Sequence, residues 1–116
     1  MKKHVLRMRQ TDKFIFNSIK EGLKTIETRA ATDKHRRITE GDILVFACAG
    51  EKLEKKIKKV DCYKTIDQMI EKIDFKKVIP FIDSIEEMKK VYFSFPGYKE
   101  KINQFGLIAF ELAEEH

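Results

Sequence analysis

The sequence predicts an α+β fold, in which a small, curled, mixed sheet of about five strands forms a partly open β-barrel with helices packed around it. Three observations lead to this prediction. Five segments have the length and apolar pattern of strands: residues 4–8, 25–30, 43–48, 52–63 and 106–112. The longest changes the phase of its apolar positions, which predicts a β-bulge near Lys58 and Lys59 and lets the sheet curl. Helical periodicity falls in two groups, before Lys24 and from Thr65 to Val91.

In the first half of the chain, a helix separates the first two strands. Thr11 is its predicted N-cap and Gly22 its end, with Leu23 packing back on the helix. Residues 31–37 are polar and basic and predict a loop. Residues 43–48 form a continuous apolar run, so we expect the most buried strand there, at the centre of the sheet.

The second half carries most of the helical signal. Thr65 is a predicted helix N-cap, and residues 75–79 add a further turn or two. Ser84 and Glu87 have the spacing of a capping box, which opens another helix. Residues 99–105 predict a short helical or irregular piece before the last strand.

Length and composition place the chain among single globular domains. Its 116 residues are enough for one hydrophobic core, so we expect one domain over residues 1–116. Hydrophobic residues make up 42% and charged residues 37%, and no apolar run nears the roughly 20 residues of a membrane span. No apolar segment of a secretory signal follows the basic start. A cytoplasmic protein without membrane contact is therefore expected.

The cysteines do not indicate a metal site. Cys48 and Cys62 lack metal-ligand spacing and lie in apolar, strand-like runs, so buried, reduced, structural thiols are expected. No metal and no other cofactor is predicted.

Positive charge is concentrated in the first half of the chain. Residues 1–64 carry 17 Lys and Arg against 9 Asp and Glu, whereas residues 65–116 carry 7 against 10. This distribution favours a polyanionic partner, because basic surfaces attract phosphate; the alternative is a lysine-rich surface that only keeps the protein soluble.

One strand gathers the side chains best suited to chemistry. Lys24, Glu27 and Arg29 lie within six residues and alternate with apolar positions, which predicts one face for the core and one for a ligand. Arg29 offers a planar fork for phosphate or a base edge, Lys24 a mobile point charge, and Glu27 an acceptor for an exocyclic amine. The alternative is a half-buried edge strand with an internal ion pair.

Two aromatic side chains outside this strand are further candidates for ligand binding. Tyr98 and Phe93 have the character of residues that stack on an unpaired base, although aromatic side chains more often pack in a core.

These segments resemble the ASCH domain family, a branch of the PUA-like barrels, over nearly the whole chain. The resemblance rests on residues 22–29 (GLKTIETR), 38–46 (ITEGDILVF) and 98–110. It implies a cleft between barrel and helices, floored by the strand from Lys24 to Arg29, that binds RNA or nucleoside-like ligands. The expected ligand-binding residues are Lys24, Thr25, Glu27, Arg29, Lys34, Arg36, Arg37 and Tyr98, the basic loop contacting phosphate.

Some relatives resemble amidohydrolases that deacetylate N4-acetylcytidine with a Lys, a Thr three residues later and a distant Glu. Here Lys24 matches, but Glu27 stands in place of the Thr, and the distant acid falls near Phe81. Thr25 and Thr28 point to opposite faces of a strand, so at most one faces the cleft. We therefore expect a binding domain and no hydrolysis of N4-acetylcytidine.

Two other functions stay open. One is an enzyme that uses Lys24 and Glu27 as catalytic residues, either an amidohydrolase acting on N4-acylated cytidine or a nuclease. The other is a regulatory domain whose partner is a protein.

Overall fold

The computed structural model describes residues 1–114 of the chain. Its elements, in chain order, are β1 (Lys3–Arg7), the 3₁₀ turn η1 (Gln10–Asp12), α1 (Lys13–Lys20), β2 (Ile26–Ala30), α2 (Asp33–Arg36), β3 (Ile43–Cys48), β4 (Glu51–Tyr63), α3 (Ile66–Ile70), α4 (Phe75–Val78), α5 (Ile85–Ser94), α6 (Tyr98–Phe105) and β5 (Leu107–Leu112).

The strands form one mixed, five-stranded sheet in the order β1-β3-β4-β5-β2. β1 and β3 run parallel, and the other neighbours run antiparallel. The α+β class and the mixed sheet are therefore confirmed. The barrel is not, because the sheet stays open with β1 and β2 as its two edges.

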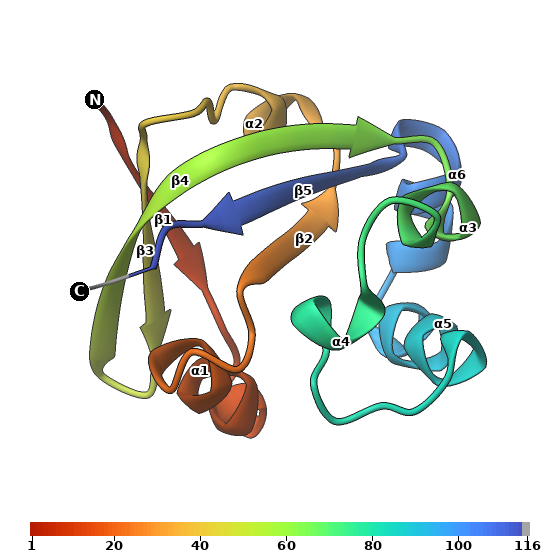
Figure 1. Cartoon of the computed structure of the whole chain (residues 1–116), viewed down its shortest axis with the longest axis horizontal. Helices are drawn as coiled ribbons and strands as arrows, with labels where there is room; N and C mark the ends of the chain where they lie inside the picture. Colours follow the sequence, from red (N-terminus) through yellow and green to blue (C-terminus); the bar gives the residue numbers. More distant parts are fainter. Residues whose placement is uncertain (115–116) are drawn as a thin grey trace.

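β4 gives the sheet its curvature. Its pairing with β5 slips between Ile57 and Lys59, which confirms the predicted bulge. Residues 51–56 of β4 pair with β3, and the strand pairs with β5 from Ile57 onwards, so it arches over the molecule (Figure 1). Since a bulge increases the local twist, the β1–β3 end is turned away from the β5–β2 end.

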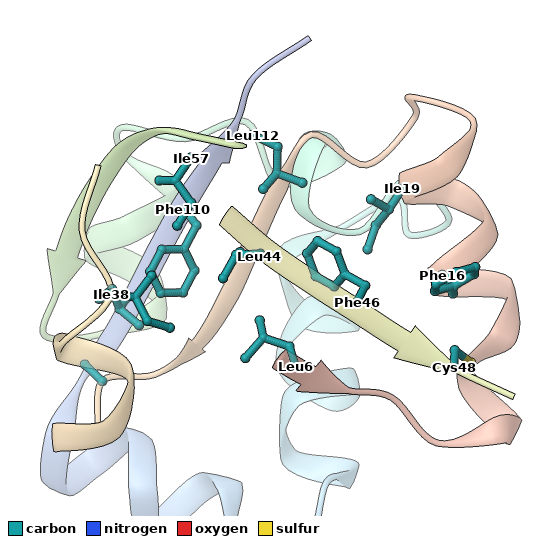
Figure 2. Packing of buried hydrophobic residues seen from close by; sticks show 12 residues of the cluster. Leu6, Phe16, Ile19, Ile38, Leu44, Phe46, Cys48, Ile57, Phe110 and Leu112 are labelled. Carbon is teal, nitrogen blue, oxygen red and sulfur yellow. The ribbon is translucent and has the colours of Figure 1, made fainter. Parts of the chain in front are cut away.

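Two hydrophobic cores lie on opposite sides of β5. The first fills the inside of the curl beneath α1 (Figure 2) and consists of Leu6, Phe16, Ile19, Ala31, Ile38, Leu44, Phe46, Cys48, Ile57, Ile108, Phe110 and Leu112. The second joins the sheet to the helices from α3 to α6 and consists of Ile26, Ile66, Met69, Val78, Ile82, Met88, Tyr92, Ile102, Leu107 and Ala109.

The position of the central strand differs from the prediction. β4, not β3, is the middle strand, and β5 is more completely buried than β3. β5 alternates Ile108 and Phe110 into the first core with Leu107 and Ala109 into the second. The apolar run of β3 did not reveal this, because burial on both faces depends on the helices that follow much later in the chain.

Helix caps were predicted with mixed success. The side chains of Thr65 and Ser84 accept hydrogen bonds from the amides of Gln68 and Glu87, which confirms both N-caps. Thr11 is not the cap of α1: it lies inside η1, and Asp12 precedes the helix without a side-chain cap bond.

Three further expectations are wrong. Leu23 is 56% exposed, because the chain leaves α1 through Gly22 in the left-handed region (φ 81°) and turns Lys24 inward instead. The predicted loop 31–37 contains the short helix α2. Cys62 is exposed, because its side chain faces a shallow groove beside Arg36 rather than a core.

No helix within residues 1–114 is both long and apolar enough to span a bilayer.

Candidate functional site

A cavity of about 300 Å³ separates the N-terminal part of the chain from the helices. Figure 1 shows β2 running between α1 on one side and α4, α5 and α6 on the other. The walls come from these elements and from the segments that connect them. The lining residues are Arg7, Met8, Arg9, Asp12, Ile15, Lys24, Glu27, Thr28, Arg29, Val78, Ile79, Pro80, Phe81, Val91, Tyr92, Phe95, Pro96, Tyr98 and Lys101.

β2 presents an unpaired strand edge. The backbone groups of its odd-numbered residues face β5. At the two ends of this pairing, the Thr25 carbonyl accepts from the Leu112 amide and the Ala31 amide donates to the Gly106 carbonyl. Backbone groups alternate in direction along a strand. The polar groups of Ile26, Thr28 and Ala30 therefore face the free edge.

Three predicted site residues form hydrogen bonds with backbone groups along that edge. Lys24 Nζ donates to the Ile26 carbonyl at 2.8 Å, and Glu27 Oε1 accepts from the Thr28 amide at 2.9 Å. The Tyr98 hydroxyl accepts from the Ala30 amide at 3.2 Å. Unpaired backbone groups away from water cost free energy, so these contacts stabilise β2 as an edge strand whatever else the side chains do.

Lys24 is held rigidly and is not the mobile point charge that was expected. The residue is 4% exposed. Its Nζ atom also donates to the Val78 carbonyl at 2.6 Å and lies 3.5 Å from Glu27 Oε1. Burial lowers the pKa of Lys24, with partial compensation from Glu27. Two carbonyls and a carboxylate match the three protons of an ammonium group, which is the form that this arrangement fits.

Glu27 is a buried, ionised acceptor. It is 6% exposed, and its second oxygen lies 3.4 Å from the Arg29 guanidinium. Burial alone would raise the pKa of Glu27, but Lys24, Arg29 and the Thr28 amide outweigh it and hold that pKa below its usual range. The site therefore presents a carboxylate at neutral pH.

Arg29 is the most accessible of the three charged groups on β2. Its side chain is 22% exposed, against 8% for Glu27 and 4% for Lys24. Glu27 and Arg29 line the same cavity, as the alternation of the strand predicted. Arg29 thus keeps guanidinium protons free for a ligand, since within residues 1–114 its one polar partner is Glu27, at 3.4 Å.

Thr28 of β2 and Thr25, which precedes the strand, differ as predicted. Thr28 lines the cavity, whereas Thr25 is not among the lining residues. The Thr28 hydroxyl is hydrogen-bonded to the Tyr92 hydroxyl, and burial raises the pKa of Tyr92 well above its ordinary value. Tyr92 is therefore neutral and cannot act as a base towards Thr28 at neutral pH.

The basic segment 34–37 lies away from the cavity. None of Lys34, Arg36 and Arg37 is among its lining residues. Arg36 instead donates to the carbonyls of Ala31 at 2.8 Å and Phe105 at 3.0 Å, so it fastens α2 to the ends of β2 and α6. Lys34 and Arg37 are exposed on the surface.

Many residues that line the cavity opposite β2 were not predicted from the sequence. Arg7, Arg9, Phe81, Phe95 and Lys101 all line the cavity. Arg9 lies over the Phe95 ring at 5.3 Å from its centroid. The aromatic turn at residues 93–98 was visible in the sequence, but nothing local indicates that Arg7 and Lys101 meet at one cavity.

The arrangement of these elements recurs in known proteins. The family model for the ASCH domain matches residues 11–115. This chain belongs to the ASCH domain family.

Two solved structures resemble this ASCH domain. The crystal structure of hypothetical protein PH0355 is 37% identical, with 97% of each chain covered and a TM-score of 0.79. The solution structure of protein PF0455 from Pyrococcus furiosus is 33% identical, with 94% of this chain and 96% of that chain covered and a TM-score of 0.71. No curated protein matches the chain.

Metal ligands are not gathered in the part of this ASCH domain that the structure describes: no cluster of three or more His, Cys, Asp or Glu side chains is placed to hold an ion. What the cavity does gather is a buried carboxylate, a half-buried guanidinium and aromatic walls. That combination can bind a flat, polar group that carries both hydrogen-bond donors and acceptors.

Proposed function

We propose that this ASCH domain binds RNA or a modified nucleotide by taking one nucleotide unit into the cavity beside β2. The observation that supports this most directly is the pairing of an ionised acceptor, Glu27, with a partly accessible donor, Arg29, in one cavity. Together they match the mixed donor and acceptor edge of a nucleobase. Lys24 then acts indirectly, since its buried charge keeps Glu27 ionised.

The walls suit the faces of a base. Tyr98 lines the cavity, and its hydroxyl is fixed by the Ala30 amide. Its ring packs edge-on against Phe95, with 5.5 Å between centroids and 79° between planes. An aromatic ring held in this way can stack on an unpaired base, a contact worth about 1–3 kcal/mol in single-strand binders.

The Glu27 carboxylate gives the proposal a base preference. Cytosine, adenine and guanine carry an exocyclic amine that donates to a carboxylate, whereas uracil does not. A hydrogen bond to a charged group is worth about 1.5–3 kcal/mol, or roughly tenfold in affinity and more. We therefore expect cytidine monophosphate (CMP) to bind at least about tenfold tighter than uridine monophosphate (UMP).

Lys34 and Arg37 extend the proposal to longer RNA. Lys34 is exposed on α2 and Arg37 directly after it, and both carry charges suited to phosphate, whereas the guanidinium of Arg36 is engaged by backbone carbonyls. Phosphate contacts make binding weaker as salt rises. Flattening of that salt dependence by Arg37→Ala would support a role for residues 34–37 in binding the RNA backbone.

Binding is a better match to the site than hydrolysis. An amidohydrolase or nuclease needs an activated nucleophile or water. Here the protons of Lys24 are directed at carbonyls and Glu27, the Thr28 hydroxyl is bonded to Tyr92, and the lowered pKa of Glu27 makes it a weak base. Release of cytidine from N4-acetylcytidine by the purified protein, followed by chromatography, would favour the enzyme instead.

Titration calorimetry with CMP and UMP tests the proposed function. Arg29→Met should weaken CMP binding by about tenfold or more, because a guanidinium contact is lost while the length of the side chain is kept. Lys58→Met is the matched control, since Lys58 is an exposed cation of β4 outside the cavity. Equal CMP affinity in wild type and Arg29→Met, or no binding of CMP, would reject the proposal.

A further inference from the structure

Two half-exposed phenylalanine rings meet where the cavity opens to solvent. Phe14 of α1 is 53% exposed, and Phe81, between α4 and α5, is 48% exposed. Their ring centroids are 5.3 Å apart with 57° between the planes. Phe81 also lines the cavity, whereas Phe14 lies just outside it. Large aromatic surface left in water beside a cavity is typical of a contact site.

Two exposed cations without an acidic partner also line the cavity. Arg7 of β1 and Lys101 of α6 line the cavity and are exposed. Among residues 1–114, neither has a carboxylate within salt-bridge distance. The other lining cations differ, because Arg9 pairs with Asp12 and both Lys24 and Arg29 pair with Glu27. The exposed part of the cavity lining therefore carries uncompensated positive charge suited to an anion.

The size of the cavity limits what it encloses. At about 300 Å³ it is at the lower end of the range for ligand pockets, which suits one base with its sugar. A phosphate attached to that sugar has to lie at the opening. Any neighbouring nucleotide has to lie outside, where Phe14 and Phe81 are exposed.

Resting on the proposed function, we infer that the natural ligand is a single-stranded oligonucleotide rather than a free nucleotide. One nucleotide enters the cavity, its phosphates contact Arg7 and Lys101, and the adjacent base stacks on the Phe14–Phe81 pair. A base held in a duplex does not fit this geometry, because it would have to leave its stack and its partner to enter.

Comparing CMP with the trinucleotide ApCpA by titration calorimetry tests this inference. In wild type the trinucleotide should bind at least about tenfold tighter than CMP, which is the gain expected from one stacked base and added phosphate contacts. Phe14→Ala should remove most of that gain. The gain is measured in each protein as the ratio of its affinity for ApCpA to its affinity for CMP. Phe93→Ala is the control, since Phe93 is 43% exposed on α5 and does not line the cavity.

A second variant tests the cations. In Arg7→Ala/Lys101→Ala, the fall of trinucleotide affinity with salt should become shallower by about 1.4 units in the log–log slope, as expected for two lost phosphate contacts to a single strand. An unchanged slope would remove these cations from the interface and overturn the inference.

The outcomes separate the two proposals. CMP binding without a gain for the trinucleotide would overturn the oligonucleotide inference and leave the proposed function intact. A gain that survives Phe14→Ala, or that Phe93→Ala removes equally, would also overturn it. If neither CMP nor ApCpA binds, both proposals are wrong.

Discussion

Replacing Lys24 by Met should destabilise the protein strongly, although Met preserves the length and apolar stem of the side chain. The substitution removes the donor to the Ile26 and Val78 carbonyls and the more deeply buried of the two positive charges beside Glu27. Within residues 1–114, the buried carboxylate then keeps Arg29, at 3.4 Å, as its one counter-charge.

Removing one member of a buried ion pair costs about 3–5 kcal/mol, because the remaining charge is uncompensated. Arg29 still offsets part of the charge on Glu27, so we expect the lower end of this range, about 3 kcal/mol. That is a large share of the roughly 5–15 kcal/mol that holds a typical domain folded. The corresponding surface change, Lys90→Met on α5, should stay within about 0.5 kcal/mol.

Urea denaturation of Lys24→Met, Glu27→Gln and the double variant measures this effect. The double variant should lose less than the sum of the single losses, since a neutral Gln needs no counter-charge, and a coupling of about 1–3 kcal/mol is expected. The denaturant slope should stay the same in all four proteins. A loss below about 1 kcal/mol in Lys24→Met, with additive effects in the cycle, would refute a structural role for the pair.

Two other predictions concern stability alone. Gly106→Ala should cost about 3 kcal/mol in urea denaturation, because φ is +77° and a Cβ would lie 2.4 Å from the Tyr63 carbonyl oxygen; Gly50→Ala, also at positive φ but in open space, should cost only about 1 kcal/mol. Equal losses would show that the close approach is irrelevant. Hydrogen bonds, first of all from His4, hold the pKa of Asp42 below its ordinary 3.8, so its stabilisation is complete above about pH 4 and is lost as the pH falls further. Stability measured from pH 4 to pH 2 should therefore fall less steeply in Asp42→Asn than in wild type, and parallel curves would contradict this.

Local signals predicted much of the fold. The phase change in residues 52–63 gave the bulge of β4, and the caps at Thr65 and Ser84 gave two helix starts. Each depends on residues a few positions apart. The central strand was misplaced, because β5 is buried by elements on both of its faces, some more than 40 residues away in the chain.

The residues of the candidate site also fall into those that the local sequence predicts and those that it does not. Glu27 and Arg29 share a strand, so the alternation of β2 was enough to place them together. Arg7 and Lys101 come from opposite ends of the chain and meet only in the folded protein. The fixed position of Lys24 was also unpredictable, since one of its acceptors is the carbonyl of Val78 in α4.

The side chains that satisfy the edge of β2 have a consequence for self-association. An open strand edge is a template on which another chain can add a strand, the first step of domain swapping and of fibril growth. At β2 the places of an incoming backbone are already taken by Lys24, Glu27 and Tyr98. The other edge strand of the sheet is β1. There, the charges of Lys3 and Arg7 oppose the addition of a strand from another copy. The residues that shape the cavity thus also keep one copy of the protein from adding to the next.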